Sequence, residues 1–349
     1  MAGDAGTSAL SNARSHARLD EDDVRVRPGR GSRPRTRRRP AHEDAIDGFV
    51  AGVDRGRYRC YIGDRTITAM KARELGRGGI VVGDRVALSG DVSGLPGTLA
   101  RIVRVAPRTS VLRRSAEDDD PTERVIVANA DQLVIVTALA NPPPRPRLID
   151  RFLVAAYDAG LKPLLCLTKA DLAAPDELIA AYEPLGIRAV VLSRPFHDQL
   201  DSLRALLAGR ISVLVGHSGV GKSTLVNALL PDADRAVGAV SPVTGRGRHT
   251  SSSAVALPLP GWPAGQTGQA GSGWIIDTPG LRSFGLGHVA ANRVVSAFGE
   301  FADAIAECPP GCTHLAPGCA LDGWVAEHGG AAERLDSLRR LLRSREGGG

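Results

Sequence analysis

The chain has 349 residues, which is enough for two or three domains and at least one sizeable hydrophobic core. Apolar residues make up 43% of the sequence, as in soluble globular proteins, and no apolar run approaches the ~20 residues that a membrane-spanning helix needs. The net charge is +6, and no apolar stretch follows the charges at the start of the sequence. We therefore expect a cytoplasmic protein without a secretory signal or a membrane partner.

Residues 1–44 are expected to form a disordered tail. Eight arginines and no acidic residue lie between Val24 and Pro40, and a block of this kind cannot bury apolar surface. Its charge would attract the phosphate backbone of a nucleic acid. A tail that only keeps the protein soluble is the alternative, and the sequence leaves both open.

Residues 45–108 carry short alternating runs separated by glycines, which predict a small all-β barrel. The expected strands cover residues 48–53, 57–62, 65–70, 84–88 and 99–105. Five short strands with Gly and Asp turns are typical of the OB-fold, a barrel that often binds nucleic acid. The acidic stretch 117–120 that follows is predicted to be a linker.

Residues 109–289 predict an α/β domain with a parallel sheet and helices on both of its faces. Apolar strands are expected at 131–138, 163–167, 189–192, 211–215 and 274–276, and helices at 148–159, 176–185 and 223–230. Strands that alternate with helices along the chain favour this architecture.

A phosphate-binding loop is predicted between the strand at 211–215 and the helix that follows it. Gly216 to Ser223 match the pattern G-x-x-x-x-G-K-[ST] in full. Glycines allow backbone amides to surround phosphate oxygens, and the following helix directs its N-terminus at the anion. We expect Lys222 to reach the β- and γ-phosphates and Ser223 to bind Mg²⁺. The alternative, a chance glycine turn, does not account for the strand and helix on either side.

A second motif that is expected to contact the phosphates and Mg²⁺ follows the strand at 274–276. Asp277 is followed by Thr, Pro and Gly280. In proteins with such a loop, an acid at a neighbouring strand end holds Mg²⁺, usually through water. Gly280 could offer its amide to the γ-phosphate. This motif is weak alone and strong after a full phosphate loop.

Thr168, Lys169 and Asp171 follow a buried strand and predict guanine recognition. GTP-binding proteins read the base with N-K-x-D at such a place, and an Asp carboxylate accepts hydrogen bonds that adenine cannot donate. Thr168 replaces the usual Asn, which alters one contact but keeps Asp171. Ser193 follows the next strand and could support the base, although a turn-forming serine is an equal alternative.

The order of these motifs is unusual, because the guanine motif precedes the phosphate loop. The same sheet can be built when the chain ends are moved. The Asp277 region then leads directly into the C-terminal segment, and nucleotide state could pass to whatever follows Leu281. The sequence therefore predicts a circularly permuted nucleotide-binding domain.

Residues 290–349 combine a cysteine cluster with helical segments. Three cysteines and a histidine lie close together at Cys308, Cys312, His314 and Cys319, which in a cytosolic chain favours a metal site over disulfides. The chain is expected to be helical after residue 292, and a final amphipathic helix carries Leu335, Leu338 and Leu342. Arg339, Arg340, Arg343 and Arg345 surround these leucines. We expect that charged face to be solvated, with binding to RNA as the alternative.

Together these motifs resemble the ribosome-small-subunit-dependent GTPase A (RsgA) family. The matching segments are 127–136, 216–224, 245–250, 277–280 and 312–319, within a resemblance that covers about residues 46–345. The resemblance implies a GTPase acting in late maturation of the small (30S) ribosomal subunit. It also implies an OB-fold that contacts 16S rRNA, and one structural Zn²⁺ on Cys308, Cys312, His314 and Cys319. We expect a monomer.

The resemblance adds a first switch at residues 245–252. Thr250 would close on Mg²⁺ and the γ-phosphate, with Ser251 as the alternative, and His249 would assist hydrolysis. Leu281 stands where many GTPases have the glutamine that orients water, so slow turnover that the small subunit stimulates is expected.

The predicted site residues fall into three groups. The nucleotide-binding residues are Thr168, Lys169, Asp171, Ser193, Gly216, His217, Ser218, Gly219, Val220, Gly221, Lys222, Ser223, Thr224 and Gly280. The catalytic residues are Lys222, Asp277, His249 and Thr250, and the Mg²⁺ ligands are Ser223, Thr250 and Asp277. GTP and GDP are the expected substrate and product.

Two alternatives remain open. One is a regulatory GTPase with the same active site that acts on another RNA or protein. The other is an RNA-binding protein with a silent nucleotide pocket, which would leave Lys222, Ser223 and Asp277 without a role.

Overall fold

The computed structural model describes residues 42–76, 78–115, 123–196, 198–230, 254–259, 273–278, 285–286, 289–328 and 331–345. The predicted arginine-rich tail, the linker at 117–120 and the predicted first switch at 245–252 lie outside these residues. The elements that follow all belong to the unit His42–Gly349.

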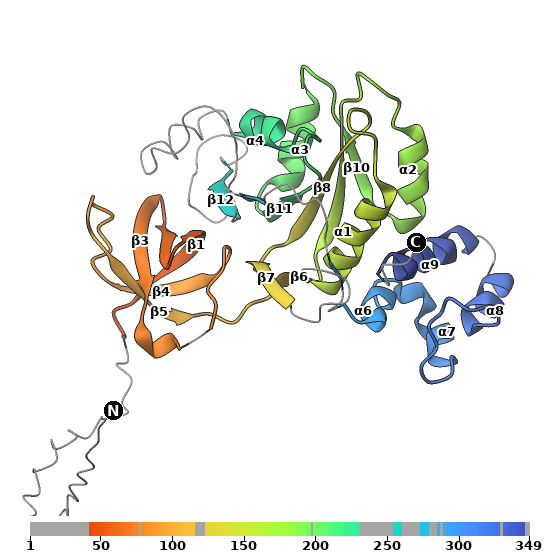
Figure 1. The fold of residues 1–349 in the computed structure, drawn as a ribbon, viewed down its shortest axis with the longest axis horizontal. Coiled ribbons are helices and arrows are strands. Elements are labelled where there is room, and N and C mark those ends of the chain that lie inside the picture. Colours follow the sequence, from red (N-terminus) through yellow and green to blue (C-terminus); the bar gives the residue numbers. More distant parts are fainter. Residues whose placement is uncertain are drawn as a thin grey trace, which may run out of the picture. The chain divides into compact units, whose positions relative to one another are not determined.

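The first strands form a five-stranded barrel, as predicted (Figure 1). They are β1 (Ile46–Asp54), β2 (Arg57–Ile62), β3 (Arg65–Lys71), β4 (Arg85–Gly90) and β5 (Ala100–Val105), with a short 3-10 helix η2 (Arg73–Leu75) after β3. The order is β1-β2-β3-β5-β4, and β4 pairs back with β1 to close the barrel. Its core is made by side chains that alternate along the strands, including Val50, Cys60, Ile67, Leu88 and Ile102.

A hairpin that the sequence analysis did not predict joins the barrel to the α/β part of the structure. It consists of β6 (Val111–Ser115) and β7 (Glu123–Ala128), and Arg113 and Arg114 interrupt the apolar alternation of β6. The barrel approaches this hairpin closely at Gly83, which has φ 93°, because a Cβ there would lie 1.9 Å from the carbonyl oxygen of Ala128. Only glycine fits such a contact.

The α/β part of the structure contributes six strands, in the order β10-β9-β8-β11-β13-β12, to a sheet that continues into the barrel at β1. These strands are β8 (Gln132–Ala138), β9 (Lys162–Thr168), β10 (Arg188–Val191), β11 (Ile211–Val215), β12 (Val255–Pro258) and β13 (Trp274–Asp277). Five strands are parallel, as predicted, whereas β12, whose bounds were not predicted, pairs antiparallel with β13. β12 also pairs with β1 at Val255 and Gly52.

Helices cover both faces of these six strands, in agreement with the sequence analysis (Figure 1). The core on one face includes residues of α1 (Pro146–Asp158), with Tyr182 of α2 (Asp176–Tyr182) and Leu185 of the 3-10 helix η3 (Glu183–Leu185). The core on the other face includes residues of α3 (Gln199–Leu207) and α4 (Lys222–Leu229). The carboxyl ends of β8, β9, β11 and β13 therefore meet at one edge.

The C-terminal segment is helical but more divided than the sequence suggests. The run expected after residue 292 is split into α6 (Ala291–Val295), a 3-10 helix η4 (Gly299–Phe301) and α7 (Ala302–Ala306), followed by α8 (Ala320–Glu327) and α9 (Ala332–Arg345). Phe298 and Phe301 are nevertheless buried on one apolar face. None of the described helices is both long and apolar enough to cross a membrane.

The expectation of a solvated arginine face on α9 is wrong for two residues. Leu335, Leu338 and Leu342 are buried as predicted. However, Arg339 pairs with Asp322 and Arg340 pairs with Asp150, so these two arginines face protein groups.

Candidate active site and metal cluster

The loop between β11 and α4 has the backbone shape that its glycines predict. Gly219 and Gly221 have φ values of 84° and 92°, in the left-handed region that favours glycine. A Cβ on Gly216 would lie 2.4 Å from the carbonyl oxygen of Val136, so the loop passes directly against β8. Helix α4 begins at Lys222, and Ser223 and Thr224 lie in its first turn. The loop can therefore present backbone amides and a helix N-terminus to one anion.

Lys222 and Asp277 lie side by side at this edge of the sheet. β11 and β13 are parallel neighbours, and Leu214 is in register with Asp277. The Lys222 ammonium group contacts the Asp277 carboxylate and the carbonyl oxygen of Thr278. The Thr278 hydroxyl in turn donates to the carbonyl oxygen of Leu214 at 2.7 Å, which fixes the end of β13 beside the loop. The cation and the acid that the sequence predicted for phosphate and Mg²⁺ are thus brought together.

The predicted guanine motif contacts the phosphate loop directly. Thr168 ends β9 and is 4% exposed, and its hydroxyl donates to the carbonyl oxygen of Val220 at 2.6 Å. Lys169 has φ 61°, and its ammonium group donates to the carbonyl oxygen of Gly219 at 3.0 Å and also to that of Asn141. The threonine that replaces asparagine therefore still ties the motif to the loop.

Asp171 and Ser193 lie in adjacent connections at the same edge. The amide of Arg194 lies 3.4 Å from a carboxylate oxygen of Asp171, and the amide of Ser193 donates to the side-chain oxygen of Gln199 at 2.9 Å. The role of Ser193 beside the base stays a prediction. His249, Thr250 and Gly280, with Ser251 and Leu281, lie outside the described residues, and their roles stay predictions.

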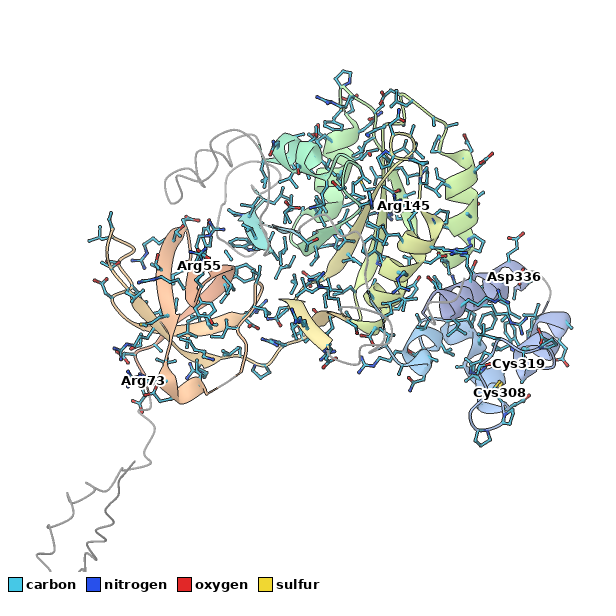
Figure 2. The ribbon with its side chains drawn as sticks, viewed as in Figure 1. Arg55, Arg73, Arg145, Cys308, Cys319 and Asp336 are labelled. Carbon is cyan, nitrogen blue, oxygen red and sulfur yellow. The ribbon has the colours of Figure 1, made fainter. Side chains whose placement is uncertain are left out.

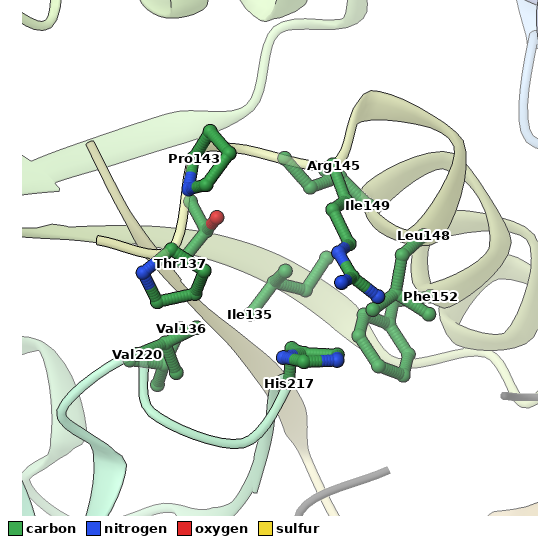
Figure 3. Close-up of a pocket in the computed structure, with 11 residues that line it drawn as sticks. Ile135, Val136, Thr137, Pro143, Arg145, Leu148, Ile149, Phe152, His217 and Val220 are labelled. Carbon is green, nitrogen blue, oxygen red and sulfur yellow. The ribbon is translucent and has the colours of Figure 1, made fainter. Parts of the chain in front are cut away.

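A pocket adjoins the phosphate loop on the side of α1 (Figure 3). Its lining includes Pro142 and Arg145 from the connection between β8 and α1, and His217 from the loop. The Arg145 side chain turns back over the pocket toward His217. The sequence analysis did not single out Asn141, Pro142 or Arg145. The one indication in the sequence was that these residues follow the strand at 131–138, whose carboxyl end lies beside the phosphate loop.

The four predicted metal ligands converge between α7 and α8 (Figure 2). The Cys308 sulfur lies 3.4 Å from that of Cys319 and 3.6 Å from Nδ1 of His314. The Cys312 and Cys319 sulfurs are 3.8 Å apart, and all four donor atoms lie within 4.8 Å of one another. Zn–S bonds of ≈ 2.3 Å in a tetrahedron would place sulfurs about 3.8 Å apart. The donor set and its spacing therefore fit one tetrahedral ion.

The surroundings of the cluster lower the pKa of two of its ligands and raise that of a third. The backbone amide of His314 points at the Cys312 sulfur, 3.4 Å away, and this contact lowers the pKa of that thiol. Burial raises the pKa of the Cys319 thiol to about 12. Burial, and then the charge of Arg339, lower the pKa of His314 and favour the neutral imidazole that binds metals.

The chain is similar to two solved structures of the same architecture. YloQ, described as a circularly permuted GTPase, matches with a TM-score of 0.60 at 21% identity, over 89% of this chain and 98% of YloQ. YjeQ from Thermotoga maritima matches with a TM-score of 0.60 at 24% identity, over 87% of this chain and 99% of YjeQ. The fold is that of a circularly permuted GTPase.

Sequence comparison specifies the family. The profile of the RsgA GTPase family matches residues 105–287. Two relatives are named small ribosomal subunit biogenesis GTPase RsgA. That of Pseudomonas syringae pv. syringae (strain B728a) is 41% identical over 76% of this chain and 75% of the relative, and that of Pseudomonas aeruginosa (strain LESB58) is 40% identical over 76% of each. The chain belongs to the RsgA GTPase family, which confirms the resemblance inferred from its motifs.

Proposed function

We propose that this protein hydrolyses GTP at the edge formed by β9, β11 and β13, and that it acts in the biogenesis of the small ribosomal subunit. The observation that carries the chemistry is the contact of Lys222 with Asp277 beside the phosphate loop. The partner rests on the relatives, which are named for biogenesis of that subunit. Late maturation, binding of 16S rRNA and a monomeric state belong to the same proposal.

The described residues support in-line attack of water on the γ-phosphate. Lys222 and the amides of residues 216–223 would neutralise charge that develops on phosphate oxygens. The hydroxyl of Ser223 is exposed in the first turn of α4, and the carboxylate of Asp277 lies beside Lys222. This pair of oxygen donors suits Mg²⁺, which when bound would offset negative charge on the phosphates. The residues present therefore fit the ion that the family requires.

Guanine selection is assigned to Asp171, with Lys169 along the base. The carboxylate would accept hydrogen bonds from the base, and adenine would leave it unpaired. Lys169 is already anchored to the phosphate loop through the carbonyl oxygen of Gly219. Ser193, in the neighbouring connection, would support the same base.

Replacing Thr168 with valine is expected to weaken GDP binding. The change keeps the shape of the side chain but leaves the Val220 carbonyl oxygen without the hydroxyl that now donates to it at 2.6 Å. Loss of a buried partner costs about 1–3 kcal/mol, so the Kd for GDP should rise by roughly 5- to 150-fold. The measurement is titration with a fluorescent GDP analogue.

Thr168→Ser is the matched control, because it keeps the hydroxyl and should bind GDP nearly as well as the wild type. Equal affinity of the valine variant and the wild type would show that the hydroxyl does not hold the loop.

The cysteine–histidine cluster is proposed to hold one structural Zn²⁺. Three thiolates and one imidazole form a closed set with no position for a substrate. The distances of 3.4–3.8 Å between neighbouring donor atoms fit such a site. The ion would then cross-link the chain between α7 and α8 and would take no part in hydrolysis.

The barrel is proposed to be an OB-fold that contacts 16S rRNA. Its β3 and β5 are parallel and its remaining pairs antiparallel, in a closed five-stranded arrangement. Exposed arginines such as Arg55, Arg73, Arg101 and Arg104 lie on this barrel (Figure 2 labels the first two). Binding through such side chains weakens as salt rises, because counterions are released.

The test is GTP turnover by the purified protein, alone and with purified small ribosomal subunits, at fixed salt. Slow basal turnover that rises on adding subunits would support both parts of the proposal. Clean hydrolysis with no rise would favour a regulatory GTPase with another RNA or protein partner. No hydrolysis under either condition would favour an RNA-binding protein with a silent pocket.

A further inference from the structure

Two consecutive arginines of α9 reach in different directions. Arg339 donates to the carbonyl oxygen of His314 at 3.0 Å and pairs with Asp322 at 2.8 Å. His314 belongs to the metal cluster, and Asp322 also accepts from the amide of Gly318 at 3.1 Å. Arg339 thus holds the loop that carries the cluster on two sides.

The side chain of Arg340 points away from the cluster and contacts α1 and α2. Its guanidinium donates to the carboxylate of Asp150 on α1 at 3.2 Å and to the carbonyl oxygen of Ala181 on α2, also at 3.2 Å. It also lies over the ring of Tyr182, 4.9 Å from the ring centre. The side chain of Asp150 is only 3% exposed. Burial raises the pKa of this carboxyl group, and the charge of Arg340 opposes that increase. Arg340 and the hydroxyl of Tyr182 therefore compensate the charge of a carboxylate that is itself buried.

Tyr182 links Arg340 to the segment that precedes α1, which lies beside the nucleotide site. Its hydroxyl donates to the carbonyl oxygen of Pro146, the first residue of α1, at 3.1 Å. The residues just before Pro146 touch both nucleotide motifs. The carbonyl oxygen of Asn141 accepts a hydrogen bond from Lys169. Pro142 packs against the phosphate loop, because a Cβ added to Gly219 would lie 3.6 Å from its ring.

We propose that Arg340 is a positioning residue for the guanine-nucleotide site and that, through α9, it couples this site to the metal cluster. The cluster holds the side chain of Arg339 in place. Because Arg340 is the next residue of the same helix, its position follows from that of Arg339. Arg340 and Tyr182 in turn hold the start of α1 against Lys169 and the phosphate loop. Metal binding and nucleotide binding then stabilise one another by the same factor, as linkage requires. The inference rests on the nucleotide site proposed above.

The test is a cycle that combines metal removal with a change on α9, in the full-length protein. The Kd for a fluorescent GDP analogue is measured with Zn²⁺ present and after chelation. In the wild type, chelation should raise the Kd by about 10-fold, within the range typical of coupled sites. In Arg340→Met the Kd should be raised with Zn²⁺ present and change by less than about 2-fold on chelation, because the contacts of α9 with Asp150 and Ala181 are removed.

Arg343→Met is the matched control. Arg343 is an exposed arginine on the same helix, one turn further on, and has no role in the contacts above. This variant should keep both the affinity and the response to chelation of the wild type. A response in Arg340→Met as large as that in the wild type would overturn the coupling.

The reciprocal measurement separates positioning from a loss of stability alone. The affinity for Zn²⁺, measured by competition with a chromophoric chelator, should rise about 10-fold with GDP in the wild type and stay unchanged in Arg340→Met. If Arg340→Met does not fold, Tyr182→Phe removes the hydroxyl that donates to the carbonyl oxygen of Pro146 and that also interacts with Asp150, and it should reduce both responses. Unreduced responses in that variant would overturn the proposal.

The two proposals fail in different ways. A wild-type protein that binds no GDP overturns the proposed function and, with it, the coupling. A wild-type protein that binds GDP equally well with and without Zn²⁺ overturns the coupling alone.

Discussion

Replacing Lys222 with alanine is expected to lower the rate of GTP hydrolysis by about 10²- to 10³-fold, the loss typical when one group that stabilises transition-state charge is removed. Lys222 begins α4 and its side chain is 8% exposed, and its ammonium group is held at the loop by Asp277 and Thr278. Its contact with Asp277 shows that it lies at the edge where the phosphates and Mg²⁺ are proposed to bind. The measurement is release of phosphate under single-turnover conditions.

Lys162→Ala is a suitable control for this change. Lys162 is exposed and begins β9, so it lies at the end of the strand opposite Thr168. This variant should hydrolyse GTP at the wild-type rate. Wild-type turnover in Lys222→Ala would contradict the mechanism, and an intact cellular function in that variant would support a silent nucleotide pocket.

Loss of one cluster ligand is expected to have a comparably large effect on the C-terminal segment. Replacing Cys312 with serine removes one of four donors that lie within 4.8 Å of one another. Since loss of a group that merely orients a ligand costs about 10- to 100-fold in metal affinity, loss of a ligand should weaken Zn²⁺ binding by at least about 100-fold. Zinc content should fall from one ion per chain to near zero, as measured by elemental analysis.

The same variant should lose protection from hydrogen exchange around the cluster, because metal binding and local folding are one process in such a site. Cys60→Ala is the control, since Cys60 is a thiol buried in the barrel core, remote from the cluster. It should keep one bound Zn²⁺. A Cys312→Ser protein that retains a full, tightly bound ion would show that Cys312 is not a ligand.

The parts of the site that the sequence predicted well are those set by short-range pattern. The loop at 216–223 was recognisable because its glycines and Lys222 lie within one strand–loop–helix unit. Thr168 and Asp277 were placed correctly because each ends an apolar strand, and the ends of parallel strands share an edge. The cluster ligands fall within twelve residues of chain, so their convergence needed no knowledge of the rest of the fold.

The parts that the sequence did not predict depend on partners far along the chain. The hydroxyl of Thr168 finds the carbonyl of Val220, 52 residues away, and Arg340 finds Asp150, 190 residues away. Amphipathic spacing identified the apolar face of α9 but could not say which acceptors its arginines meet. The hairpin of β6 and β7 was missed and the bounds of β12 were not predicted, because short strands owe their existence to the neighbours with which they pair.

The position of α9 has a consequence for how the molecule is made. Synthesis proceeds from the N-terminus at about 5–20 residues per second, and domains tend to fold as they emerge. Helix α1 therefore leaves the ribosome well before α9, and until α9 arrives Asp150 lacks the arginine that compensates its buried charge. A growing chain that already carries both nucleotide motifs still has an uncovered surface on α1. We expect nascent chains of this length to expose this surface of α1 until α9 has emerged and packed against it.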